Sequence, residues 1–329
     1  MIAEPPVRRS TTEWAPPASI VPVSYLTTSM GGRLAIHLDP AANGGNARET
    51  ARRIAGRIES WADRLTRHTD ASELMALNSD PRSEVEVGPT LAAALRAGRT
   101  ANEVTEGLAD ITLLDARLAA EDSEATAQRA AYFTVGEWHG EWSLSGGARG
   151  SATVRRPPGL RFDLAGVGKG WIADRAIDAL SAWPSCLIDA DGDMAIRCAP
   201  GRSWEIGIDD PRTPDALLAM LRLSASGRVP ERWGVATSGT SVHRWNIGGQ
   251  VRHHIIDPRT HLPAVTDVVQ ATVVAGSALI AEALTKAVVI AGTVDGFALL
   301  ERSRALGAVV LTDRGETFAL PNTLPLLVG

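Results

Sequence analysis

The residues best suited to chemistry lie at 161–176, RFDLAGVGKGWIADRA, where three glycines surround one lysine. Apolar residues predict a strand before the glycines, and an amphipathic helix is expected at 171–182. Glycine lets the main chain approach a ligand closely, and N–H groups at a helix start carry partial positive charge. Together with Lys169, these glycines and N–H groups predict a binding site for a phosphate or pyrophosphate, although such turns also occur as purely structural connections. The segment is not a P-loop, because Gly170 stands where that motif has Ser or Thr.

The chain has 329 residues, of which 44% are hydrophobic, and a net charge of −5. This composition predicts a soluble, cytoplasmic protein of a size typical of enzymes. We expect an irregular, proline-rich arm at 1–22 and one domain at 23–329. The acidic balance argues against a nucleic-acid partner, whose binding would rest on clustered Lys and Arg. We find no signal peptide, and no apolar run that approaches the roughly 18 residues of a membrane span.

The two cysteines, Cys186 and Cys198, lie on either side of a turn at Asp191-Gly192. They are placed to face each other across a hairpin. In a reducing compartment, however, two buried thiols are expected rather than a disulfide.

The periodicity of apolar residues predicts helices at 48–65 and 70–80, and another that opens at Ser277 and ends at Gly292. A hairpin is expected to turn at Asp191-Gly192, and a helix or loop at 214–222. Hairpins mixed with helices indicate an α+β fold of mixed, largely antiparallel sheets with flanking helices.

Five segments share one property: polar or glycine residues stand where an apolar strand ends. They are Gly166–Gly170, Asp189–Asp193, Ala236–Thr240, His253–Arg259 and Ser277–Lys286. Because strand ends of one sheet can converge on a single cleft, we expect these segments to line one site.

These segments resemble the motifs of the FAD:protein FMN transferases, the flavin transferases of the ApbE type. DLAGVGKGWIAD (163–174) is similar to the family's D-L-G-G-I-A-K-G-Y-x-x-D, and ATSG (236–239) to its A-T-S-G. HIIDPRTHLP (254–263) resembles H-I-I-D-P-R-T-G-x-P, and DADGD (189–193) resembles N-x-G-G-D. The resemblance extends from about residue 30 to 320 and implies an ApbE-like, T-fold-related architecture.

The resemblance implies that the chain moves FMN from FAD onto a Thr or Ser hydroxyl of an acceptor flavoprotein, releasing AMP. The partner implied is a flavoprotein that carries a Thr-containing flavinylation motif. Two other functions stay open: a protein that binds FAD without transfer, and a pyrophosphatase that hydrolyses FAD to FMN and AMP.

The resemblance also implies the site residues. Lys169 is expected to neutralise phosphate charge, and His254 or Asp257 to accept the hydroxyl proton, with the choice between them open. Each implied residue also has an ordinary structural role open to it, such as an ion pair for Arg259 or a solvated charge for Glu73. The residues expected to contact FAD are Met30, Glu73, Asp110, Gly166, Gly168, Lys169, Asp193, Thr237, Ser238, Gly239, His254, Ile255, Asp257, Arg259 and Lys286.

The metal site implied by the family is altered in this chain. The resemblance gives a cation held by a main-chain carbonyl and by an Asp and a Thr four residues apart. The corresponding residues are Gly168, Glu282 and Lys286, with Thr285 one position away. A protonated lysine cannot ligate a cation. Either Gly168, Glu282 and Thr285 still hold Mg²⁺, or the Lys286 ammonium replaces it; we expect Mg²⁺ to be retained, because pyrophosphate transfer generally uses a metal.

Overall fold

The structure, a computed structural model, describes residues 18–43, 45–121, 141–241, 244–247, 250–303 and 305–328. Of the predicted arm at 1–22, residues 1–17 lie outside this part of the chain. The first strand, β1 (Ala18–Ser19), pairs in parallel with β9 (Arg202–Asp209). The boundary between arm and domain at residue 23 stays a prediction.

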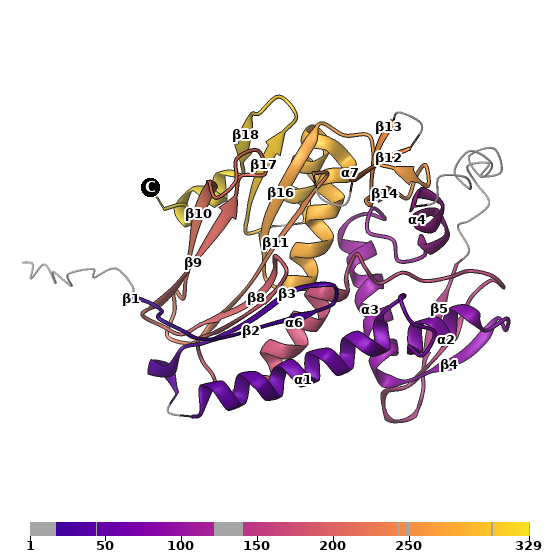
Figure 1. The fold of residues 1–329 in the computed structure, drawn as a ribbon, viewed down its shortest axis with the longest axis horizontal. Coiled ribbons are helices and arrows are strands. Elements are labelled where there is room, and N and C mark those ends of the chain that lie inside the picture. Colours follow the sequence, from indigo (N-terminus) through magenta and orange to yellow (C-terminus); the bar gives the residue numbers. More distant parts are fainter. Residues whose placement is uncertain are drawn as a thin grey trace, which may run out of the picture.

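An eight-stranded sheet forms the centre of the molecule, and all of its neighbouring strands are antiparallel (Figure 1). Its order is β18-β17-β16-β11-β8-β7-β3-β2. The bounds are β2 Val23–Ser29, β3 Gly32–Leu38, β7 Cys186–Ala190, β8 Asp193–Cys198, β11 Glu231–Gly239, β16 Val268–Ala275, β17 Gly307–Thr312 and β18 Thr317–Ala319.

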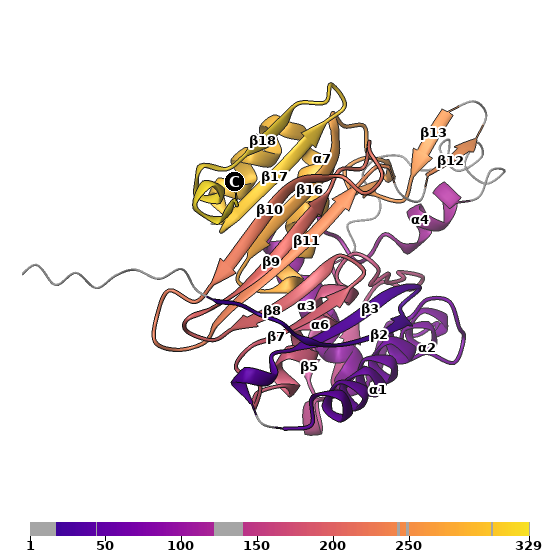
Figure 2. The same ribbon diagram turned by 60° about the vertical axis from the view of Figure 1, so that its left-hand side comes forward.

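Helices cover one face of this sheet, and a small second sheet lies on the other (Figure 2). That second sheet has the order β1-β9-β10, with β10 spanning Leu217–Ser224. The helices are α1 Ala47–Leu65, α2 Glu73–Ser79, α3 Pro89–Val104, α4 Leu114–Glu121, α6 Gly168–Ala179 and α7 Ala278–Arg302. Mixed helices and mainly antiparallel strands confirm the predicted α+β class.

The remaining elements are short. A three-stranded sheet has the order β4-β6-β5, and two hairpins precede β16. These strands are β4 Glu84–Val87, β5 Ser143–Gly146, β6 Ala152–Arg155, β12 Arg244–Ile247, β13 Gln250–His253, β14 Ile256–Asp257 and β15 Leu262–Pro263. The 3-10 turns are Pro40–Ala42, Ala148–Gly150 and Pro321–Leu326.

Alternation along the strands of the hairpin β7–β8 divides the core into two layers. Cys186 and Ile188 pack with the helices, whereas Leu187, Ile196 and Cys198 pack against the β9–β10 sheet. The two cysteines therefore lie on opposite faces and do not face each other. Both are free and buried, and burial raises the pKa of Cys186 to about 12 and that of Cys198 to about 11.

The predicted helix at 48–65 is α1, and the hairpin does turn at Asp191-Gly192, both of which have positive φ. The expected helix or loop at 214–222 is wrong, because this segment forms most of β10. Antiparallel pairing with β9 and burial of Leu221 and Leu223 override the helix propensity of its leucines.

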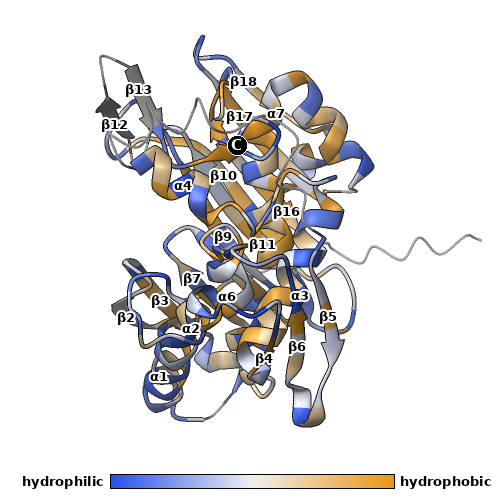
Figure 3. Cartoon of the chain, turned by 90° about the vertical axis from the view of Figure 1, so that its right-hand side faces the viewer, coloured by the Kyte–Doolittle hydropathy of each residue, from blue (hydrophilic) through white to orange (hydrophobic). Residues whose placement is uncertain are grey.

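Helix α7 passes through the core. By length and composition it is apolar enough to cross a membrane, with a mean hydropathy of 1.6 over 18 residues. The sequence analysis predicted no apolar run of that length. In the structure it packs against β11, β16, α3 and α6, and β16 and much of α7 are coloured as hydrophobic (Figure 3). A core position therefore accounts for its composition. The predicted end at Gly292 corresponds to a non-helical residue with φ 81°, after which helix resumes to Arg302.

The helix N-termini of α6 and α7 meet at very close range over β11. A Cβ on Gly170 would lie 2.6 Å from the carbonyl oxygen of Ala278, and one on Gly234 would lie 2.0 Å from the carbonyl of Ser277. Asp174 joins the two helices, since its carboxylate accepts hydrogen bonds from the N–H groups of Ala278 and Leu279. Glycine at these positions therefore sets the approach of the two helices.

We predict that Gly234→Ala lowers the free energy of unfolding by about 1–3 kcal/mol or more, because the added methyl meets main chain that cannot turn aside. The matched control is Gly56→Ala in α1, where a Cβ meets nothing within 4 Å. That change should stabilise by about 0.5–1 kcal/mol through helix propensity. Urea unfolding measures both, and equal effects of the two changes would contradict the packing described for β11 and α7.

Candidate active site

A cavity of about 1430 Å³ runs from the β9 side of the central sheet to the N-terminus of α6. Its volume exceeds the range of about 300–1,000 Å³ that is common for drug-sized ligands. Nine of the predicted site residues line it: Met30, Gly168, Lys169, Asp193, Thr237, Ser238, Gly239, His254 and Lys286. Residues that are far apart in the sequence are thus brought to one site, as predicted from the strand ends.

Lys169, in the first turn of α6, pairs with Asp193 at the start of β8. Its Nζ lies 2.8 Å from Asp193 Oδ2 and donates to the carbonyl of Asp191 at 3.4 Å. Burial opposes the charge on Lys169, but the carboxylates of Asp193 and Glu282 outweigh it and raise the pKa of the ammonium. Lys169 is therefore positively charged where it enters the cavity.

Asp193 is fully buried and lies close to a second carboxylate. Burial and the charge of Glu282 raise the pKa of Asp193 to about 6, although Lys169 opposes the shift. Its Oδ1 has no hydrogen-bond partner among the described residues. Burial of the charged Asp193 carboxylate therefore costs free energy, and the ion pair with Lys169 opposes that cost.

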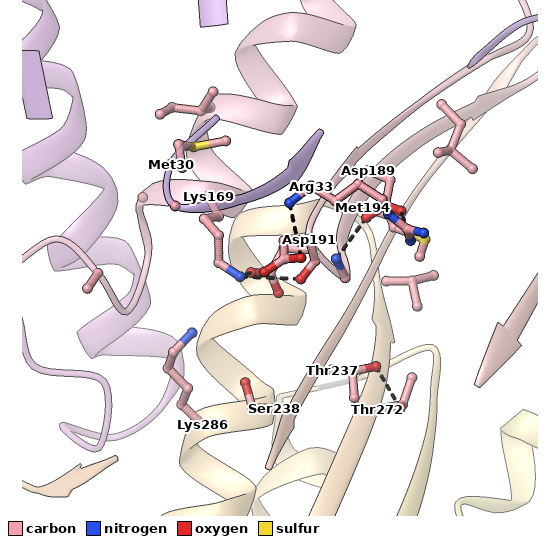
Figure 4. Close-up of a pocket in the computed structure, with 18 of the residues that line it drawn as sticks. Met30, Arg33, Lys169, Asp189, Asp191, Met194, Thr237, Ser238, Thr272 and Lys286 are labelled. Carbon is pink, nitrogen blue, oxygen red and sulfur yellow. Dashed lines mark hydrogen bonds and ion pairs between the residues drawn. The ribbon is translucent and has the colours of Figure 1, made fainter. Parts of the chain in front are cut away.

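Glu282 in α7 is completely buried, and both of its carboxylate oxygens are engaged. Oε2 accepts a hydrogen bond from the Gly170 N–H at 2.8 Å, and Oε1 accepts one from Lys286 Nζ at 2.9 Å. The second contact is an i,i+4 ion pair within α7. Lys286 continues past Glu282 to the cavity wall, and Figure 4 shows its ammonium and that of Lys169 directed toward the same space.

The main-chain N–H groups of the glycine turn are largely used within the chain. Gly168 N–H donates to the carbonyl of Leu164, and Gly170 N–H donates to Glu282. The expectation that these two N–H groups seat a phosphate is therefore not met by their hydrogen bonding. Lys169 and Lys286 are the residues of this segment and of α7 whose charged side chains line the cavity.

Hydroxyl groups of β11 line the floor of the cavity. Thr237 Oγ1 lies 2.9 Å from Thr272 Oγ1, and Ser238 Oγ lies 2.9 Å from Thr285 Oγ1. The single Thr285 proton is donated to the Glu282 carbonyl, so Ser238 is the donor in the second pair. The motif ATSG thus ties the cavity floor to α7.

The turn between β2 and β3 closes one side of the cavity. Met30 and Gly31 both have positive φ, and a Cβ on Gly32 would lie 2.4 Å from Asp191 Oδ2. Gly31 and Gly32 therefore allow the β2–β3 turn to lie against the β7–β8 turn. Arg33, the next residue, is not among the predicted site residues, and its guanidinium pairs with Asp189 at 3.1 Å beside the cavity.

Sequence reasoning also missed the wall contributed by β9. Trp204, Ile206 and Ile208 line the cavity, and the Trp204 ring lies 6.4 Å from that of His37, which lines it as well. Neither their types nor their spacing forms a motif that would mark β9 as part of a site. Its contribution is an apolar and aromatic surface.

The two candidate proton acceptors are separated by the structure. His254 lines the cavity, whereas Asp257 does not. The Asp257 carboxylate is held by the guanidinium of Arg259, with Nη2 to Oδ2 at 2.8 Å, and by the Arg259 N–H. That contact raises the pKa of Arg259. Position therefore favours His254 over Asp257, and Arg259 takes the structural role that was left open for it.

Four further predicted FAD contacts are not in the cavity wall. Glu73 pairs with Arg64 at 2.8 Å and lies in a smaller hollow at α1 and α2. Asp110 accepts from the N–H and hydroxyl of Thr112, as a turn residue does. Ile255 is buried in the core beside α7, and Gly166 lies against the Lys286 side chain. Their predicted contact with FAD is not supported by their position.

The predicted Mg²⁺ ligands do not fit a divalent cation. Mg²⁺ needs near-octahedral oxygen ligands, but Glu282 faces two N–H donors and the Thr285 hydroxyl is bonded to Ser238 and to main chain. The Lys286 ammonium lies against the same carboxylate and would repel a cation. The described residues also contain no cluster of three acidic, His or Cys side chains. The expectation that Mg²⁺ is retained at Gly168, Glu282 and Thr285 is therefore not supported.

The chain belongs to the ApbE family, whose model matches residues 30–310. A protein of Vibrio cholerae named FAD:protein FMN transferase is 24% identical over 293 residues, which cover 82% of each chain. One of Treponema pallidum with the same name is 30% identical over 168 residues. That alignment covers 46% of this chain, and the chain spans about 44% of that relative's length.

Two solved structures show the same architecture. The ApbE protein of Thermotoga maritima superposes with a TM-score of 0.76 at 23% identity, covering 94% of this chain and all of that one. The flavin transferase ApbE from Vibrio cholerae gives 0.74 at 22% identity, covering 93% and 99%. The predicted ApbE-like fold is thereby confirmed.

The raised pKa of Asp193 predicts how stability depends on pH. The folded chain holds this proton up to about pH 6, whereas an unfolded Asp releases it near 3.8. Stability should therefore fall as pH rises from about 4 to about 6, by roughly 2–3 kcal/mol for this residue. Asp193→Asn removes the effect, so its stability relative to the natural chain should rise over that range. Urea unfolding at both ends measures it, and a constant difference between the two proteins would contradict the assignment.

Proposed function

We propose that this chain transfers FMN from FAD to a Thr or Ser hydroxyl of an acceptor flavoprotein, with release of AMP. The observation that carries the proposal is the meeting of Lys169, Lys286 and His254 in one large cavity of an ApbE-family fold. Two cations can stabilise negative charge on a diphosphate, and an imidazole can accept the proton of an attacking hydroxyl. The names of the relatives from Vibrio cholerae and Treponema pallidum support the same reaction.

The cavity has the two kinds of wall that a flavin dinucleotide needs. Trp204, Ile206 and Ile208 give an apolar surface for a flat ring system. Lys169 and Lys286 give positive charge for the diphosphate that joins the two halves. We infer that FAD lies with its diphosphate beside the α6 N-terminus.

The step conserves atoms and charge without any further reactant. The acceptor's hydroxyl oxygen attacks the phosphorus of the FMN half, and the bond from that phosphorus to the bridging oxygen breaks. The bridging oxygen keeps the electron pair and leaves as part of AMP. Lys169 and Lys286 stabilise negative charge on the phosphate oxygens as it develops, and the hydroxyl proton passes to a base on the enzyme.

We infer that His254 is that base, because it lines the cavity and Asp257 does not. The unperturbed pKa of histidine lies near neutrality, so its imidazole can accept a proton at working pH. Asp257 instead holds Arg259 in the same loop, which fixes the segment that carries His254.

The activity is tested by incubating the chain with FAD and an acceptor flavoprotein that carries a Thr-containing flavinylation motif. We expect AMP release and an FMN-sized mass increase on an acceptor Thr, measured by mass spectrometry. AMP and free FMN without acceptor would instead support the pyrophosphatase, because water would then replace the hydroxyl. FAD bound but never cleaved would support a binding protein and contradict transfer.

His254→Asn should slow transfer by about 10²–10⁴-fold, the usual contribution of a general base, while FAD binding changes little. The matched control is His261→Asn in the turn between β14 and β15. That residue does not line the cavity, and its φ of 57° suits Asn. Single-turnover AMP release measures the rate. Equal rates for both variants would remove His254 from the proposed mechanism.

A further inference from the structure

We propose that the Lys286 ammonium, held on the buried Glu282, takes the place of a divalent cation at this site. On this proposal the chain binds the diphosphate of FAD and transfers FMN without Mg²⁺. The statement that FMN is transferred without Mg²⁺ rests on the proposed function. The statement that FAD binds without Mg²⁺ rests on the geometry of Glu282 and Lys286.

Neither oxygen of Glu282 is without a hydrogen-bond donor. Its two oxygens accept hydrogen bonds from Gly170 N–H and Lys286 Nζ at 2.8 and 2.9 Å, and its side chain is completely buried. A cation placed there would have to displace an ammonium that the carboxylate already neutralises.

The Lys286 ammonium has capacity left for a ligand. An ammonium carries three donors, and the described residues supply it with one acceptor, Glu282 Oε1. Its side chain is 16% exposed and lines the cavity that Lys169 also enters. Two N–H donors are thus positioned to hydrogen-bond phosphate oxygens, which is what a bridging cation would otherwise do.

The lysine content of the chain supports a special role for these side chains. The chain has 33 basic residues, and only Lys169 and Lys286 are lysines. Both point into the cavity, whereas the exposed ion pairs in the described chain use arginine. A lysine ammonium presents its charge to a phosphate oxygen as a compact point charge with three donors. Chance placement on the surface therefore does not account for the two lysines.

Because there are two lysines, ¹⁵N-lysine labelling gives two side-chain NMR signals and a direct view of the site. In excess EDTA, FAD should shift both signals, and its Kd should equal that in excess Mg²⁺ within about twofold. Mn²⁺ alone should leave the Lys286 signal unbroadened. A Kd that weakens tenfold or more in EDTA, or broadening of Lys286 by Mn²⁺, would overturn the proposal.

The activity assay separates this proposal from the proposed function. AMP release with acceptor in EDTA supports both. Release that appears only with Mg²⁺ keeps the transferase and overturns the lysine's role. No release under either condition overturns the transferase, and the binding and NMR results then decide the role of Lys286.

Two sets of variants test the exchange of lysine for metal. Glu282→Asp with Lys286→Thr restores the family's ligand pair, and Mn²⁺ should then bind and broaden the remaining Lys169 signal. Glu282→Gln with Lys286→Met removes the charge of both partners, while the amide oxygen at position 282 can still accept from the Gly170 N–H, and should weaken FAD binding at least about tenfold. Glu84→Gln with Arg155→Met, which removes an exposed ion pair in the same way, is the matched control. If the first pair gains no Mn²⁺ affinity, or the second binds FAD like the control, the proposal is wrong.

Discussion

The buried carboxylate of Glu282 is the contact that the site depends on. One of its oxygens holds the Gly170 N–H at the start of α6, and the other holds the Lys286 ammonium one turn along α7. A single charged group thereby fixes the meeting of two helices and aims a cation at the cavity. Burial makes this arrangement strict, because an unpaired carboxylate at that position would be very costly.

Close packing of main chain makes the arrangement of charges possible. Gly170 and Gly234 leave no side chain between α6, α7 and β11, so the Glu282 carboxylate can reach across to α6. Asp174 fixes the same junction by capping α7 from α6. The glycine-rich turn is therefore first a packing device, and its contribution to ligand binding comes mainly through the Lys169 side chain.

The parts of the site that could be predicted from the sequence are those whose chemistry is visible in a short motif. Lys169, Asp193 and Ser238 stand at strand or helix ends, and the antiparallel sheet brings those ends together. Asp257 could not be placed in this way, because its partner is Arg259, two residues along, rather than the cavity.

Residues whose role depends on long-range packing could not be predicted from the sequence. Trp204 is one apolar residue among many until β9 folds over the central sheet. The segment at 214–222 has the leucines of a helix and becomes a strand because β9 offers it hydrogen bonds. Whether Glu282 can bind a metal depends on where the Lys286 side chain lies. The four-residue spacing of Glu282 and Lys286 along a helix does not determine that position.

A crystal structure of the chain with FAD, grown in excess EDTA, would show whether the Lys286 ammonium stands in for a cation. We expect the diphosphate within hydrogen-bond distance of both Lys169 Nζ and Lys286 Nζ, with the Lys286–Glu282 pair intact. A diphosphate bound away from the α6 N-terminus, or a dinucleotide that is ordered only when a cation lies on Glu282, would contradict it.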